Sequence, residues 1–243
     1  VYLLELLKRF GTLTPNESFL LYHKHTWNPE LTPPAHGTYT TKAIPFPSQW
    51  MQTRFAFEMF RVQPDHIFFP VQAVPAFLPR HSKVTVTVHD LAWKYYPETF
   101  TPRTRFKLNF LLNRAVARAN TLITVSESTK QDLLSFFPEI NPDIIHVIHH
   151  GFDQNRFTPQ IPQKEKGETL ARYGLREHSY LLYVGALQPR KNLVRLIEAF
   201  NLLKSTAPEA KLVLVGETAW LADPILAARD TSPYRDAIIL TGK

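Results

Sequence analysis

The stretch Tyr183–Phe200, YVGALQPRKNLVRLIEAF, is typical of a strand that turns sharply into an amphipathic helix. An apolar run ends at Gly185, and further on large apolar residues recur at the three- and four-residue spacing of one helix face. Asn192 is expected to cap this helix. Two cations, Arg190 and Lys191, therefore come directly before the helix start.

These two cations predict a site for an anion. The first N–H groups of a helix lack intrahelical acceptors, and the helix dipole adds partial positive charge there. A phosphate or diphosphate fits such a site beside Arg190 and Lys191. Because the dipole disfavours cations at this end, we favour a ligand over plain surface charge. The stretch has neither the Walker pattern nor the three-glycine fingerprint, which argues against a P-loop ATPase or a dehydrogenase.

Strand and helix patterns alternate along most of the chain. Apolar, β-branched runs at residues 83–88, 121–126 and 144–148 are separated by helical patterns that begin after Pro102 and Ser126. This order predicts an α/β fold with parallel sheets. Ligands of such folds collect at the carboxyl ends of the strands.

One interruption of this alternation predicts two domains. Residues 152–166 are polar, contain two prolines and have no period, as in a linker. The domains would then be residues 1–151 and 167–243. Three strand patterns lie beyond the linker, at residues 179–185, 210–216 and 236–240. A Rossmann-like sheet generally has five or six strands, so the second domain is expected to be incomplete.

The composition excludes several classes of protein. The 243 residues include 28 Lys and Arg against 21 Asp and Glu, a formal charge of +7, so an anionic partner is expected. The chain has no cysteine, which excludes disulfides and thiolate metal sites and fits a reducing compartment. It has no apolar run of roughly 20 residues, and we expect a soluble protein. A nucleic-acid partner is not predicted, because no recognition helix or aromatic RNA platform is present.

Two further strand ends carry polar side chains. His89 and Asp90 end one strand and lead into an aromatic loop that contains Tyr95, where a sugar could stack and form hydrogen bonds. A core histidine with packing aromatics explains the same pattern equally well. Another strand ends in HHGFD, with Gly151 in its middle. Adjacent histidines on a strand point to opposite faces, so a metal site is not predicted.

The helix after Pro102 carries a row of cations on one side. Arg103, Lys107, Arg114 and Arg118 fall within about 60° of one another at the helical angle of 100° per residue. Such a row could contact anionic lipid or nucleic acid. A solvated helix face is the interpretation that we favour.

Four segments together resemble the family 4 glycosyltransferases, which are retaining enzymes of the GT-B fold with two Rossmann-like domains. They are VTVHDLAWKYYPETF, TLITVSESTKQDLLSFF, VIHHGFDQNRF and YVGALQPRKNLVRLIEAF, in this order over nearly the whole chain. The resemblance implies a nucleotide-sugar donor held by the second domain and a glycan or lipid-linked acceptor held by the first. Transfer would keep the anomeric configuration by front-face attack, without a metal or other cofactor.

The resemblance also implies roles for individual residues. Arg190 and Lys191 would bind the donor diphosphate, and His89 would act in catalysis by a hydrogen bond to the donor sugar near the anomeric carbon. Gly185 and Gly216 would let the backbone approach the nucleotide. Asp90, Tyr95 and Gly151 would line the acceptor side or the cleft.

Two family segments are not found, a glycine-rich loop near the N-terminus and an acidic segment near the C-terminus. We therefore expect this chain to be part of a longer enzyme and to be inactive by itself. The phosphate stretch is most similar to the branch that builds bacterial polysaccharides, often with mannose from GDP-mannose. A cytoplasmic enzyme is expected, held peripherally at an anionic membrane if its acceptor is lipid-linked. The alternative is a nucleotide-sugar or polyanion binding module without catalysis.

Overall fold

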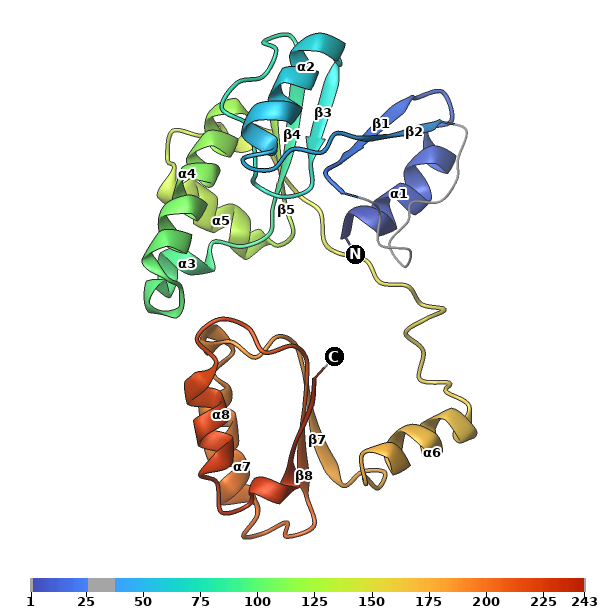
Figure 1. The fold of residues 1–243 in the computed structure, drawn as a ribbon, viewed down its shortest axis with the longest axis vertical. Helices are drawn as coiled ribbons and strands as arrows, with labels where there is room; N and C mark the ends of the chain where they lie inside the picture. Colours follow the sequence, from blue (N-terminus) through green and yellow to red (C-terminus); the bar gives the residue numbers. More distant parts are fainter. Residues whose placement is uncertain (1, 26–37, 243) are drawn as a thin grey trace. The chain divides into compact units, whose positions relative to one another are not determined.

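The computed structural model describes residues 2–25 and 38–242, and the chain forms two compact units. The first unit comprises Val1–Tyr95 and Pro102–His150, and the second comprises Tyr96–Thr101 and Gly151–Lys243. Each unit is built from parallel strands and helices, as the alternating sequence pattern predicts (Figure 1). Within the described residues, every helix is too short or too polar to span a bilayer.

The main sheet of the first unit has four parallel strands in the order β3-β4-β5-β6. Their bounds are β3 His66–Phe69, β4 Lys83–Val88, β5 Thr121–Thr124 and β6 Ile145–Val147. Val86 and Thr87 of β4 point to opposite faces of the sheet and are both fully buried. The central strand is therefore covered on both faces, as is usual in parallel sheets.

Three helices follow these strands along the chain. They are α3 Ala92–Tyr95, α4 Pro102–Arg118 and α5 Glu127–Phe136, and α4 and α5 lie on the same side of the sheet (Figure 1). The predicted cap of α5 is confirmed, because the Ser126 hydroxyl accepts a hydrogen bond of 3.1 Å from the Thr129 N–H. The short helix α3 occupies part of what the sequence suggested was a loop.

The chain before β3 adds α1 Tyr2–Leu13, the parallel pair β1 Phe19–His23 and β2 Tyr39–Ala43, and α2 Ala56–Val62. A π-helical turn, Met51–Phe55, leads directly into α2. Tyr39 joins β2 to α1, because its hydroxyl donates to the Leu7 carbonyl at 2.5 Å and accepts from the Gly11 N–H at 2.7 Å.

Glu58 of α2 is a buried carboxylate shared by three cations. Its oxygen atoms lie 2.6 Å from Lys42 Nζ, 3.2 Å from Arg54 Nη1 and 2.8 Å from Arg61 Nη2. Its side chain is 1% exposed, so the carboxylate would be strongly destabilised without these partners. Lys42 belongs to β2, and the ion pair therefore attaches the β1–β2 pair to α2.

The row of cations on α4 divides into two parts. Arg103 and Lys107 are exposed, as expected for a solvated face. Arg114 donates to the Ala76 carbonyl, and Arg118 Nη2 donates to the carbonyls of Pro79 at 2.7 Å and Ser82 at 2.9 Å. The expectation of one solvated face is therefore wrong for the second half of the helix, where the arginines hold the loop between β3 and β4.

The second unit contains three parallel strands in the order β7-β8-β9. They are β7 Tyr180–Val184, β8 Lys211–Val215 and β9 Ile238–Gly242. The helices α7 Leu193–Leu203 and α8 Asp223–Asp230 cover the same face of this sheet (Figure 1). The core between them includes Leu187, Leu193, Ile197, Phe200, Leu212, Leu214, Ile225 and Ile238.

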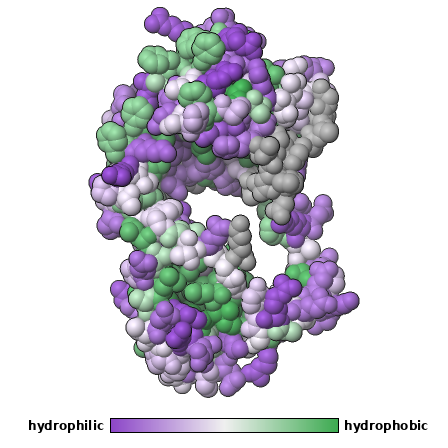
Figure 2. Space-filling model, viewed as in Figure 1, coloured by the Kyte–Doolittle hydropathy of each residue, from purple (hydrophilic) through white to green (hydrophobic). Residues whose placement is uncertain are grey.

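The other face of β7 is apolar and exposed. Leu182 is 57% exposed and Val184 is 70% exposed. Apolar surface gathers on the side of this unit that carries the strands (Figure 2).

The expected linker is shorter than the sequence suggested. Residues 163–166 are helical, because α6 spans Gln163–Arg172, so the irregular segment ends at Pro162. The sequence from Gln163 onward contains lysine and glutamate, which are good helix formers that polar composition alone does not separate from a linker.

Candidate functional site

The carboxyl edge of the first sheet brings together three aromatic rings. His89 follows β4, His150 follows β6 and Tyr2 opens α1. The two imidazole rings are stacked, with centroids 5.5 Å apart and planes inclined by 28°. The Tyr2 ring lies edge-on to both, at 5.1 Å from each centroid. The sequence singled out His89 correctly as a strand-end residue, but it gave no sign that His150 and Tyr2 would meet it.

One ring nitrogen of His89 has a hydrogen-bond partner within the protein. Nε2 lies 2.8 Å from the Pro70 carbonyl oxygen. A carbonyl can only accept, so Nε2 must carry the proton of this hydrogen bond. In the neutral ring, Nδ1 is then the nitrogen with a lone pair, and it can accept a hydrogen bond from a hydroxyl group.

His150 is held in a setting that favours its neutral form. Burial lowers the pKa of His150, and the nearby charge of protonated His89 lowers it further. A proton on one ring therefore opposes a proton on the other. His149 instead directs Nδ1 to the Val125 carbonyl at 3.2 Å, so the two adjacent histidines have different partners.

Asp90 and Tyr95 make bonds that support local structure. The Asp90 carboxylate accepts a hydrogen bond of 3.2 Å from the Ala92 N–H at the start of α3. The Tyr95 hydroxyl donates to Asp132 Oδ1 at 2.7 Å, and this bond, followed by burial, raises the pKa of Tyr95. Tyr95 is thus joined to α5, although it remains 51% exposed. Gly151 is exposed, with open space where a Cβ would lie.

No group of three His, Asp or Glu side chains in residues 2–25 and 38–242 is arranged to hold a metal ion.

At the carboxyl edge of the second sheet, all three strands lead into or end at glycine. Gly185 has φ +154°, Gly216 has φ +144° and Gly242 has φ +71°. A Cβ on Gly216 would overlap the backbone carbonyl of Gly185, so these two strand ends pack backbone to backbone. Gly242 was not predicted, because Thr241 separates it from the apolar run Ile238–Leu240, whereas Gly185 and Gly216 follow their apolar runs directly.

Backbone hydrogen bonds join the loops that follow β7 and β8. The Leu187 N–H donates to the Glu217 carbonyl at 2.9 Å, and the Ala219 N–H donates to the Leu187 carbonyl at 3.1 Å. Gly185 is tied to β8 by a bond of 2.8 Å to the Val215 carbonyl. Backbone hydrogen bonds therefore hold this edge together, and the Tyr183 hydroxyl lies where a side chain on Gly185 would begin.

Arg190 and Lys191 project from a short 3-10 turn, Pro189–Lys191, directly before α7. Both side chains are exposed. The expectation for Asn192 is wrong: it precedes α7, but it is left-handed with φ +54° and its side chain makes no capping hydrogen bond. The first N–H groups of α7 therefore do not receive a cap from this residue.

Gln188, two residues before Arg190, carries an unsatisfied acceptor. Its side chain belongs to a residue that is 6% exposed, and Oε1 has no hydrogen-bond partner among the described residues. A buried amide oxygen normally has a donor. The loop before the two cations thus contains a position that a donor group from a ligand or water would satisfy.

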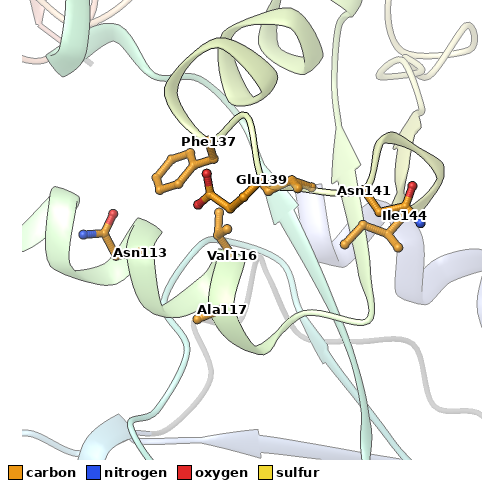
Figure 3. A pocket seen from close by; sticks show the side chains of 8 residues that line it. Asn113, Val116, Ala117, Phe137, Glu139, Asn141 and Ile144 are labelled. Atoms are coloured by element: carbon orange, nitrogen blue, oxygen red, sulfur yellow. The ribbon is translucent and has the colours of Figure 1, made fainter.

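One hollow of the first unit lies at the opposite edge of its sheet. It has a volume of about 620 Å³ and lies between the end of α4 and the segment that joins α5 to β6. Val116, Phe137 and Glu139 converge on it (Figure 3). Both helices end there and the strands begin there, so this hollow is at the amino edge, whereas ligands of parallel sheets bind at the carboxyl edge.

Two family models match the chain. The model described as Glycosyltransferase Family 4 matches residues 11–156, and the model described as Glycosyl transferases group 1 matches residues 166–234. Among curated proteins, O-antigen chain mannosyltransferase RfbU of Salmonella typhimurium is 31% identical over 121 residues, which cover 50% of this chain and 30% of that protein. Alpha-maltose-1-phosphate synthase of Mycobacterium tuberculosis is 29% identical over 115 residues, which cover 47% and 30%.

Solved structures share the fold. The structure of Anabaena Alr3699/HepE in complex with UDP and glucose has a TM-score of 0.68 at 16% identity, over 98% of this chain and 64% of that chain. WaaG, a glycosyltransferase involved in lipopolysaccharide biosynthesis, has a TM-score of 0.67 at 15% identity, over 98% and 65%. The matches cover less than two fifths of each of these curated relatives and less than two thirds of each of these solved chains. The predicted GT-B fold is confirmed by these likenesses.

Proposed function

The chain belongs to glycosyltransferase family 4, and from this premise we propose that it serves the transfer of a hexose from a nucleotide sugar to a glycan or lipid-linked acceptor. The anomeric configuration would be retained. The second unit would hold the donor and the first unit would hold the acceptor. Family membership supports the reaction class, the second unit supports a nucleotide-sugar donor, and the acceptor is taken from the family resemblance.

The observation that carries this proposal is the edge of the second sheet. The strands β7 and β8 lead into Gly185 and Gly216, which have no side chains of their own, and the loop after Gly185 carries Arg190 and Lys191 directly before α7. A nucleoside diphosphate requires both features, because its phosphates need cations and N–H donors at close range. As the sugar leaves the diphosphate, negative charge grows on the leaving group, and the same two cations would stabilise it.

On the first unit, His89 would meet the donor sugar. Its Nε2 proton is held by the Pro70 carbonyl, so Nδ1 would accept a hydrogen bond from a sugar hydroxyl. This assignment makes His89 a group that orients the sugar near the anomeric carbon. No metal or other cofactor is required by it.

GDP-mannose is the donor that we propose, and mannose would be transferred in the synthesis of a bacterial polysaccharide. Support comes from two similar proteins that are named O-antigen chain mannosyltransferases, RfbU at 31% identity and mannosyltransferase B of Escherichia coli at 28% identity. The HepE structure contains UDP and glucose, so UDP-glucose is the competing donor to be tested.

Calorimetric titration tests the donor site. GDP, UDP and their mannose and glucose conjugates are titrated into the chain, into Arg190→Ala/Lys191→Ala and into Arg103→Ala/Lys107→Ala. The last variant removes the same charge from exposed positions of α4. We expect binding that prefers guanine, that weakens about a hundredfold in the first variant and that is unchanged in the second. Equal affinity in both variants, or no binding by the folded chain, would contradict the site.

The exposed first half of α4, residues 102–110, supports a peripheral association of a cytoplasmic protein with an anionic membrane. Phe106 is 76% exposed and Phe110 is 48% exposed, beside the exposed cations Arg103 and Lys107. Aromatic rings with neighbouring cations suit the interface of an anionic bilayer. Flotation with anionic vesicles should recover the chain, and Phe106→Ser/Phe110→Ser should reduce recovery. Equal recovery with zwitterionic vesicles would contradict this proposal.

A further inference from the structure

We propose that His150 is a positioning residue for His89, which holds the imidazole so that Nδ1 presents a lone pair to a hydroxyl of the substrate. This inference rests on the proposed sugar transfer for its purpose. The positioning itself depends only on contacts within the first unit, so it can be tested separately.

Three elements fix the His89 ring from different directions. His150, from the end of β6, stacks on its face with centroids 5.5 Å apart. Tyr2, from α1, meets it edge-on at 5.1 Å with the planes inclined by 88°. The Tyr2 hydroxyl lies 3.3 Å from Thr87 Oγ1, a fully buried side chain two residues before His89. The ring therefore has packing on its face and at its edge, and a hydrogen bond from Nε2 to the Pro70 carbonyl.

The hydrogen bond to the Pro70 carbonyl selects one tautomer of His89 only while the imidazole ring keeps the orientation that points Nε2 at this carbonyl. An imidazole that can swing or flip exchanges its two nitrogens, and a carbonyl would accept a proton from either of them. The stacked His150 ring blocks this motion on one face. His150 thus makes a single tautomer of His89 the preferred one.

A neutral ring at position 150 suits the stack on His89 better than a charged side chain would. Burial and the charge of His89 both lower its pKa, which favours a neutral ring in the stack. Asp90 follows His89 in the chain, and its carboxylate accepts from the Ala92 N–H. Thr129 of α5 lies 3.4 Å from the His89 carbonyl and carries no charge. The stack is consequently most stable when neither ring carries a positive charge.

Nuclear magnetic resonance of the histidine ring nitrogens tests the positioning. The 243-residue chain is labelled with nitrogen-15 in histidine, and spectra are compared for the wild type, His150→Ala, His150→Phe and His149→Ala. The neighbour His149 bonds to the Val125 carbonyl and provides the matched control. We expect one His89 tautomer, with the proton on Nε2, in the wild type, in His149→Ala and in His150→Phe, which keeps a ring in the stack. His150→Ala should show both tautomers.

A His89 signal that is the same in His150→Ala as in the wild type would overturn the proposal, and so would a wild-type proton on Nδ1. Circular dichroism tests whether His150→Ala is folded. If it is not, His150→Leu, which fills the same space without a ring, takes its place and should also show both tautomers. Kinetics of the complete enzyme give the second readout: His150→Ala should lower kcat about tenfold and change the KM for the nucleotide sugar less than twofold. If neither the wild type nor His149→Ala transfers sugar, the proposed function fails, while the tautomer result still decides the positioning.

Discussion

The carbonyl group of Gly185 occupies the space in which a side chain on Gly216 would begin. The two residues end neighbouring strands, and both have a positive φ that disfavours residues with a Cβ. The close approach of these two backbones therefore requires glycine at position 216, which a substitution can test.

Gly216→Ala should destabilise the second unit. The substitution adds a Cβ that overlaps the Gly185 backbone and places alanine at φ +144°, so a loss of about 2 kcal/mol in unfolding free energy is expected, together with weaker nucleotide binding. Urea unfolding measures the loss. Gly167→Ala is the control, because Gly167 lies within α6 with open space around it and alanine favours helix by up to about 1 kcal/mol. Equal stability of both variants would contradict the packing.

Glu58→Gln should remove much of a pH-dependent stabilisation. Hydrogen bonds from Arg61 and then Lys42 lower the pKa of Glu58 from 4.5 to about 2, against the effect of burial. Because the folded value is the lower one, this stabilisation is fully present above pH 4.5 and is lost as the pH falls toward 2. Its size is at most about 3 kcal/mol.

Urea unfolding at pH 7 and at pH 3 checks this prediction for Glu58. The gap in unfolding free energy between the wild type and Glu58→Gln should be about 2 kcal/mol at pH 7 and should shrink at pH 3. Glu198→Gln breaks an exposed ion pair with Arg195 and should cost less than about 0.5 kcal/mol at either pH. A gap that does not change with pH would exclude the Glu58 carboxylate as its source.

Arg118→Met should loosen the loop between β3 and β4. Methionine keeps the length of the side chain but donates no hydrogen bonds, so the carbonyls of Pro79 and Ser82 lose their partner at a cost of about 2 kcal/mol. Hydrogen exchange in residues 71–82 should accelerate. The exposed Arg105 lies on the same helix, and Arg105→Met should leave this exchange unchanged.

Ser126→Ala should weaken the start of α5. The hydroxyl that accepts from the Thr129 N–H is lost, which typically costs about 1 kcal/mol. Ser128, exposed inside the same helix, gives the comparison, because Ser128→Ala should be neutral or slightly stabilising. Thermal unfolding followed by circular dichroism distinguishes the two variants, and equal midpoints would argue against the cap.

Local patterns predicted the elements that depend on local chemistry. The β-branched run of β4 and the cap at Ser126 were recognised because strand burial and capping leave signals within a few residues. The left-handed conformation of Asn192 was not recognised, because asparagine serves as a cap or as a left-handed residue and the sequence does not distinguish these roles. The start of α6 was missed for the same kind of reason, since its residues suit both helix and linker.

Contacts between distant parts of the chain were not predictable. Tyr2, His89 and His150 meet only because α1, β4 and β6 reach one edge of the sheet, and no spacing in the sequence encodes that meeting. Similarly, a helical projection places Arg114 and Arg118 on one side of α4 but does not show that a loop from residues 71–82 lies against them. The roles of His89, Arg190 and Lys191 in sugar transfer remain predictions.

The glycine ends of β7, β8 and β9 have a consequence for sequence variation. In a library that replaces every residue singly, Gly185 and Gly216 should accept almost no other amino acid, because both have a positive φ angle. A Cβ would also meet the Gly185 backbone at position 216 and the Tyr183 hydroxyl at position 185. Exposed Arg190 and Lys191 should tolerate most substitutions other than proline when selection is for folding alone and few when selection is for activity. Comparing the two selections would therefore separate the residues that shape this edge from those that act there.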